Sequence, residues 1–198
     1  MTGLLAPRDR NKTLTGLAGA ELVIGAQHAA VQRLQYFLSQ STWDADEINR
    51  RRLELLVNDP ATASHGRGVI AIDDSGDRKD GTATAHVGRQ WFGRYGKTDN
   101  GIVTVTTVWA DERIYYPPHT QPYTPASHFP HKQADPGFRT KLAIAADLIA
   151  EALAAGVVCR AVVADSFYGE HDDLRGALRQ SGQGFVMATR SSSTPAAR

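Results

Sequence analysis

Two aspartate-bearing segments are the residues best suited to chemistry. Asp73 and Asp74 come directly after the apolar run 69–72, and Asp165 comes directly after the predicted buried strand 157–164, which is apolar apart from Arg160. Neighbouring carboxylates repel each other unless a positive charge neutralises them. A hard divalent cation does so through oxygen ligands, and two such ions can clamp the attacking and leaving oxygens of a phosphodiester. The pair Asp74 and Asp165 therefore predicts a Mg²⁺-type site for phosphoryl transfer.

The elements that must position this pair follow from the apolar pattern. The predicted strands cover residues 69–72, 102–109, 113–116, 157–164 and 185–188. A turn at residues 110–112 joins the second and third strands into a hairpin. One helix starts with Asp135 as its cap and Pro136 in its first turn and ends at Gly156, and a second covers residues 171–180.

This order of elements suits a mixed α/β sheet flanked by helices. A right-handed crossover would place the strand ending at Ala164 parallel to the strand ending at Ile72. Asp74 and Asp165 would then lie side by side at a topological switch point, where open sheets place their sites. A purely structural interpretation stays open for each aspartate alone, because an aspartate after a strand is often a turn former or a helix cap.

The remaining segments divide the chain. Residues 1–15 are expected to form a flexible tail, and residues 16–63 an N-terminal helical region whose second helix starts at Asp44 and ends before Pro60. Residues 64–190 form the predicted core, with a long proline-rich loop over 117–135. The last segment, 191–198, is of low complexity and is expected to be disordered.

A polar stretch from residue 77 to 101 carries basic and aromatic side chains. The four cations expected to contact DNA phosphates are Arg78, Lys79, Arg94 and Lys97. Aromatic residues lie among them and are suited to stacking on bases. The alternative, a solvated surface with no DNA contact, stays open.

Composition sets limits on the class of protein. The 198 residues are 41% hydrophobic and 22% charged, with a formal net charge of +1, which is not the strongly basic balance of a dedicated nucleic-acid coat. No apolar run reaches the roughly 18 residues of a transmembrane helix, and the N-terminus lacks a signal-peptide core. The single cysteine, Cys159, cannot form an internal disulfide. These features predict a cytoplasmic protein without a membrane partner.

Several motifs in order resemble those of insertion-sequence transposases of the DDE superfamily. Residues 72–76 (Ile-Asp-Asp-Ser-Gly) look like the first-aspartate motif, and residues 89–93 and 96–100 look like the segment that follows it. Residues 138–141 (Phe-Arg-Thr-Lys) are similar to the start of the central helix. Residues 163–169 (Val-Ala-Asp-Ser-Phe-Tyr-Gly) are similar to the second-aspartate motif. The resemblance covers roughly residues 27–190.

The resemblance implies a ribonuclease-H-like fold and metal-dependent DNA cleavage with strand transfer. It maps Asp74 and Asp165 onto the first two catalytic, metal-binding carboxylates, with Mg²⁺ or Mn²⁺ as the cofactor. Asp73 is the competing choice for the first, but the related motif has its metal-binding aspartate directly before the Ser/Thr position, here Ser75. The implied partners are DNA, as transposon ends and target, and a second copy of the chain in a homodimer on DNA. The implied location is the nucleoid.

The sequence departs from the family in one respect. The family has a third catalytic carboxylate, a glutamate on a later helix, whereas no acidic residue follows Met187 here. The hypothesis is therefore a truncated transposase with weak or no activity, so whether the chain is an active enzyme stays open. Two alternatives also stay open: a non-catalytic remnant of the same fold that binds DNA or a transposase, and a host metal-dependent nuclease.

Overall fold

The computed structural model describes residues 29–189 and divides the chain into two compact units, residues 1–47 and 48–198. The predicted tails at 1–15 and 191–198 lie outside the described residues. Among residues 29–189, no helix has both the length and the apolar character needed to cross a membrane.

Two helices occupy the predicted N-terminal helical region. Helix α3 spans Ala29–Gln40 and α4 spans Ala45–Asn58. The Asp44 carboxylate accepts a hydrogen bond of 2.8 Å from the Glu47 amide, which confirms the predicted start of the second helix. The unit boundary falls within α4, and Leu53 on its later turns is buried in the main core. The second half of α4 thus belongs with the sheet.

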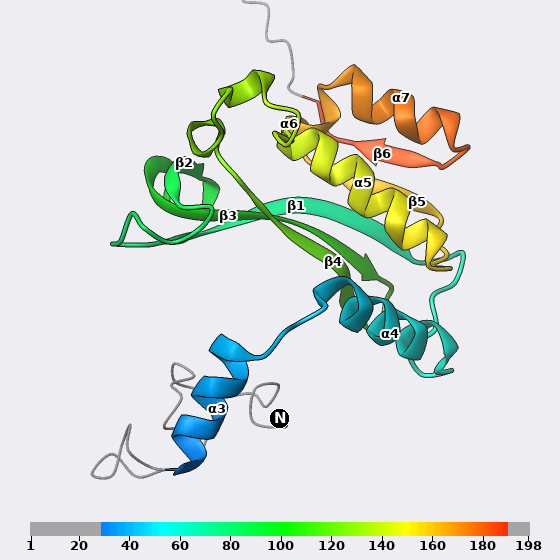
Figure 1. Cartoon of the computed structure of the whole chain (residues 1–198). Helices are drawn as coiled ribbons and strands as arrows, with labels where there is room; N and C mark the ends of the chain where they lie inside the picture. Colours follow the sequence, from blue (N-terminus) through cyan, green and yellow to red (C-terminus); the bar gives the residue numbers. More distant parts are fainter. Residues whose placement is uncertain (1–28, 190–198) are drawn as a thin grey trace, which may run out of the picture. The chain divides into compact units, whose positions relative to one another are not determined.

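The core is a six-stranded mixed sheet, which confirms the predicted fold class. Its strands are β1 (Val69–Arg78), β2 (Gly88–Phe92), β3 (Lys97–Ala110), β4 (Tyr115–Tyr123), β5 (Ala161–Ala164) and β6 (Phe185–Met187). They run in the order β2-β3-β1-β5-β6, with β4 paired to β3 (Figure 1). The β1–β3 and β3–β4 pairs are antiparallel, whereas β1–β5 and β5–β6 are parallel.

Helices cover one face of the sheet. Helix α5 (Lys141–Ala154) packs against β3 and β4 and lies beside α7 (Asp172–Gln180), while the short α6 (Ser166–Gly169) contacts α7, β5 and β6 (Figure 1). Because side chains alternate along a strand, Ile70 and Ile72 point into this layer and join the core with Trp109 and Leu148. The apolar face of α5 thereby fixes which face of β1 is buried.

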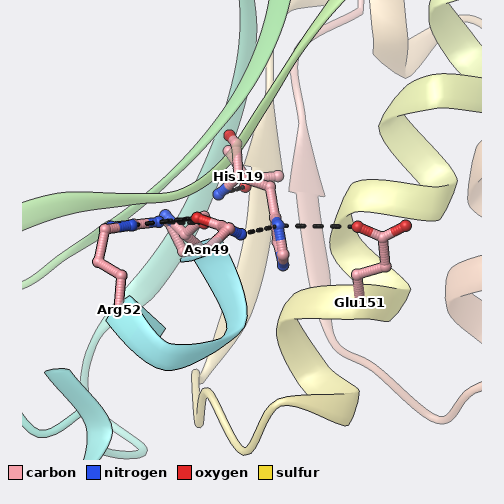
Figure 2. A network of polar contacts seen from close by, with 6 residues as sticks. Asn49, Arg52, His119 and Glu151 are labelled. Carbon is pink, nitrogen blue, oxygen red and sulfur yellow. Dashed lines mark hydrogen bonds and ion pairs between the residues drawn. The ribbon is translucent and has the colours of Figure 1, made fainter. Parts of the chain in front are cut away.

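A polar network joins α4 to the sheet and to α5 (Figure 2). The Asn49 side-chain nitrogen lies 2.7 Å from His119 Nδ1, which in turn lies 3.6 Å from the Glu151 carboxylate. The Arg52 guanidinium donates to Asn49 Oδ1 at 2.6 Å and to the backbone carbonyl of Pro118 at 2.5 Å. These contacts satisfy polar groups of β4 that α4 covers.

The strands differ from the predicted ones in length. Strand β4 runs to Tyr123, so the predicted loop 117–135 is wrong over its first third. In the described sheet β4 pairs with β3 alone, so its other edge has no neighbouring strand. A proline whose nitrogen points to that unpaired edge removes no hydrogen bond from the sheet, which is why the prolines of β4 are tolerated. Strand β2 lies within the polar stretch 77–101, where no strand was predicted. Arg89 and Trp91 are exposed on this strand, so the large aromatic Trp91 obscures the alternation of polar and apolar residues.

Two predicted element starts are also wrong. Helix α5 begins at Lys141, not near Asp135, because Thr140 is its cap and accepts from the Ala143 amide at 3.1 Å. Asp135 instead accepts from the Gly137 amide in a preceding turn. Strand β5 starts at Ala161, since the Val158 backbone is bonded to Ser64 and to the Trp109 indole rather than to a strand.

We predict that Gly68→Ala destabilises the fold by overpacking the core. A Cβ at Gly68 would lie 2.3 Å from the buried Trp109 ring, whose indole donates to the Val158 carbonyl and has no room to move. Overpacking of this kind costs about 1–3 kcal/mol. Urea denaturation should show this loss, whereas Gly66→Ala, with nothing within 4 Å of its Cβ, should unfold like the wild type. Equal midpoints for the two variants would contradict the prediction.

Candidate active site

The predicted aspartates meet in one open cleft of about 990 Å³. Asp73 and Asp74 line it from β1, and Asp165 lines it from the end of β5. The parallel pairing of β1 with β5, with Ile72 opposite Ala164, brings the segments together as predicted. The predicted juxtaposition is therefore confirmed, while the catalytic role of the residues stays a prediction.

The first aspartates lie within their strand, not beyond its end. Strand β1 continues to Arg78 as it pairs with β3, so Asp73 faces Thr106 and Asp74 faces Val105. By alternation Asp74 follows Ile72 on the helix-covered face, and Asp73 lies on the opposite face. Both nevertheless line the cleft, so the choice between them as the first ligand stays a prediction.

Local contacts hold each of these carboxylates in place. Asp73 Oδ1 accepts a 2.7 Å hydrogen bond from the Asp74 amide. Asp165 is the cap of α6, and its Oδ1 accepts from the amides of Phe167 at 3.0 Å and Tyr168 at 3.3 Å. Gly169 then lets α6 approach β6, since a Cβ there would lie 2.3 Å from the Ala188 carbonyl oxygen. The cap interpretation of Asp165 is thus correct alongside its place in the cleft.

A lysine side chain enters the same cleft. The Lys141 ammonium lies 2.5 Å from Asp74 Oδ2 and 5.7 Å from the centres of the Tyr123 and Phe167 rings. Lys141 is the first residue of α5, so Thr140 as its cap fixes where the side chain starts. The ammonium is the positive charge in direct contact with the aspartates among residues 29–189.

The mutual repulsion of the carboxylates affects their neighbours. Partial burial raises the pKa of Asp73, and the charges of Asp74 and Asp165 raise it further. The hydrogen bond from the Asp74 amide acts in the opposite direction and lowers this pKa. Tyr168 is only 1% exposed, and burial followed by the three aspartates raises the pKa of its phenol. Tyr168 is therefore a neutral phenol at any physiological pH, packed under the site.

The carboxylate oxygens are suitable ligands for a hard cation, but they do not form a complete coordination site. Among residues 29–189, no group of three or more His, Cys, Asp and Glu side chains is placed to hold one ion. Asp73 and Asp165 bond to backbone amides and Asp74 bonds to Lys141. The donor chemistry therefore fits a divalent ion, since each of these bonds uses one of the two oxygens of its carboxylate.

The four predicted DNA-contacting cations fall into two pairs. Lys79 and Arg94 line the cleft, together with Trp91, which is 58% exposed. Arg78 and Lys97 instead pair with Asp99, at 2.8 Å and 3.2 Å. A hydrogen bond from the Asn100 amide, and then one from Lys97, lowers the pKa of Asp99, so this carboxylate stays charged and competes with any phosphate.

Lys141 is the residue of this cleft that the predicted site omitted. A signal for it was present in the topology. A crossover helix runs antiparallel to the strand that follows it, so its first residues lie at the carboxyl end of that strand, here beside Asp165. Placing the helix start at Asp135 instead of Lys141 hid this relation.

Comparisons with known proteins agree with the site. Residues 1–195 match a family described as DDE superfamily endonuclease. Over 162 residues the chain is 38% identical to a protein named "Probable transposase for insertion sequence element IS701" from Microchaete diplosiphon. That alignment covers 81% of this chain and 40% of the relative, so the chain spans less than half of the relative's length. No solved structure matches the chain. Since the family match extends over nearly all residues and the aspartates of the cleft lie within it, the chain belongs to the DDE superfamily of endonucleases.

Proposed function

We propose that the chain carries the catalytic aspartates for metal-dependent DNA cleavage and strand transfer of an insertion sequence. The observation that supports this proposal most strongly is the meeting of Asp74 and Asp165 in one cleft through the parallel β1–β5 pair. The family supplies the reaction class, because a DDE endonuclease acts on phosphodiester bonds. DNA, as transposon end and target, is the proposed substrate.

The proposed cofactor is Mg²⁺ or Mn²⁺. The DDE superfamily generally uses divalent metal ions. Asp74 and Asp165 would hold the ion, with Asp73 as the competing choice for the first ligand, because all three present carboxylate oxygens to the cleft. Such an ion, when bound, lowers the pKa of a water or DNA 3′-hydroxyl and stabilises charge on the phosphate.

The chain's own residues contribute position and charge. The two hydrogen bonds to Asp165 Oδ1 fix the rotamer of that carboxylate, so its second oxygen has a defined direction. Tyr168 lies packed beneath the aspartates and excludes water from their buried side. Lys79 and Arg94, in the same cleft, are placed to attract the DNA backbone toward the carboxylates.

A second candidate function is DNA or transposase binding without catalysis. It is favoured by the lining of the cleft, in which the carboxylates from the described residues are all aspartates. We further propose that DNA is bound by a homodimer at the nucleoid, because strand transfer joins two transposon ends to one target.

The metal ligands are tested by single substitutions to asparagine. Asp74→Asn and Asp165→Asn should each weaken Mn²⁺ binding roughly 10- to 100-fold, because each removes one negative ligand while the shape of the side chain stays the same. Calorimetric titration measures the affinity. Asp77→Asn, also in the cleft, is the matched control and should bind Mn²⁺ like the wild type. If Asp73→Asn lost binding and Asp74→Asn did not, Asp73 would replace Asp74 as the first ligand.

The salt dependence of DNA binding tests the basic surface. Replacing Arg78, Lys79, Arg94 and Lys97 by alanine together should flatten the dependence of log K on log salt, because each lost phosphate contact removes a slope of about 0.9. Lys79→Ala with Arg94→Ala should account for most of the change, since Asp99 already pairs with the other two cations. An unchanged slope in the fourfold variant would remove this surface from the interface.

A strand-transfer assay tests whether these 198 residues act alone. With transposon-end DNA and Mg²⁺ or Mn²⁺, we expect DNA binding with little or no joined product, because the carboxylates that the described residues bring to the cleft are all aspartates. The same assay on DNA without transposon ends distinguishes a transposase from a host nuclease. Robust strand transfer by the purified chain would contradict the expectation of weak activity.

A further inference from the structure

The Lys141 ammonium occupies the position at which a cation is needed. Its nitrogen lies 2.5 Å from Asp74 Oδ2, and its side chain is only 17% exposed. The nitrogen also lies over the rings of Tyr123 and Phe167, at 5.7 Å from the centre of each ring. A charge-assisted hydrogen bond and two aromatic faces therefore hold one positive charge inside the cleft.

The three aspartates differ in what holds them. Asp73 and Asp165 bond to backbone amides, whose positions are fixed by β1 and by the first turn of α6. Asp74 bonds to the end of a long, flexible side chain, whose ammonium is a compact charge that can turn to another partner. Asp74 is thus the carboxylate whose present partner can be exchanged at low cost.

We propose that the Lys141 ammonium pairs with Asp74 until a divalent metal ion binds that carboxylate, and that the ammonium then pairs with a DNA phosphate instead. This inference rests on the proposed metal site and adds a role that the metal ligands do not have. Without the metal, the ammonium offsets the repulsion among Asp73, Asp74 and Asp165. With the metal bound to Asp74, the same ammonium is released beside the reacting phosphate.

The proposal implies competition between the ammonium and the metal for one oxygen. Removal of the ammonium should therefore tighten metal binding, although it leaves the carboxylates more repulsive when no metal is present. Any nearby positive charge also weakens metal binding through space. Competition is distinguished from this general effect because it requires Asp74, whereas a through-space effect acts on the remaining carboxylates too.

Calorimetric titration with Mn²⁺ tests the competition. Lys141→Met removes the charge and keeps most of the side chain, so we expect roughly tenfold tighter Mn²⁺ binding than in the wild type. Lys141→Arg keeps a cation and should bind Mn²⁺ no more tightly than the wild type. Lys79→Met, which removes a cation from the same cleft without freeing an aspartate, is the matched control and should change the affinity less than about threefold.

A double variant separates competition from a through-space effect. In the Asp74→Asn background, Lys141→Met should give no further gain in Mn²⁺ affinity. An equal gain with and without Asp74, or equal effects of Lys141→Met and Lys79→Met, would overturn the proposal. Circular dichroism of each variant confirms that it is folded; a Lys141→Met chain that fails to fold is replaced by Lys141→Gln in the same test.

DNA binding provides the second readout. With Ca²⁺ present, the salt slope of DNA binding should be smaller in Lys141→Met than in the wild type by about 0.9, the value of one phosphate contact. Without any divalent ion the salt slopes of the wild type and Lys141→Met should agree, because the Lys141 ammonium of the wild type is then paired with Asp74 and contacts no phosphate. If neither the wild type nor Lys141→Met binds Mn²⁺, the proposed metal site itself is wrong; if both bind it equally, only the role of Lys141 is wrong.

Discussion

The parallel pairing of β1 with β5 is the constraint on which the site depends. Only four residue pairs form this ladder, from Val69 with Ala161 to Ile72 with Ala164. The next positions along both strands are Asp73 and Asp165, so the ladder sets the distance between two carboxylates that are far apart in the chain. Helix α5 supplies the crossover that makes the pairing parallel, and its buried face holds the ladder from one side.

The same pairing creates an electrostatic problem that the fold resolves locally. Burial raises the pKa of Asp73, and the neighbouring charges of Asp74 and Asp165 raise it further. Backbone amides offset part of this cost at Asp73 and Asp165, and the Lys141 ammonium offsets it at Asp74. A charged site can therefore exist in the folded chain before any external cation or DNA arrives.

Much of the fold and of the site could be predicted from the sequence because both depend on strong local patterns. The β-branched runs at 69–72 and 102–109 identify strands, and the order of elements then fixes the parallel neighbour of β1. Weaker patterns failed for physical reasons. The prolines of β4 are harmless on a free edge, and Asp135 and Thr140 are equally good caps by residue type, so only packing decides that α5 begins after Thr140.

The wrong start of α5 explains why Lys141 was not among the predicted site residues. A lysine one turn inside a helix is ordinarily a solvated surface residue, whereas a lysine at the first position of a crossover helix lies at the carboxyl edge of the sheet. The choice between Asp73 and Asp74 shows another limit. Strand alternation predicts that neighbouring residues face opposite ways, but both can still reach a cleft that opens where the sheet extends past its helix cover.

The cap at Asp165 has a consequence for how folding and chemistry can be separated in this chain. Both amide bonds end on Oδ1, and an asparagine offers an acceptor oxygen in the same place. Loss of the negative charge by that single replacement would therefore leave α6 and its packing against β6 intact. Alanine at the same position would remove the charge and the cap of α6 together, so asparagine is the replacement that changes the charge of the cleft without changing the fold.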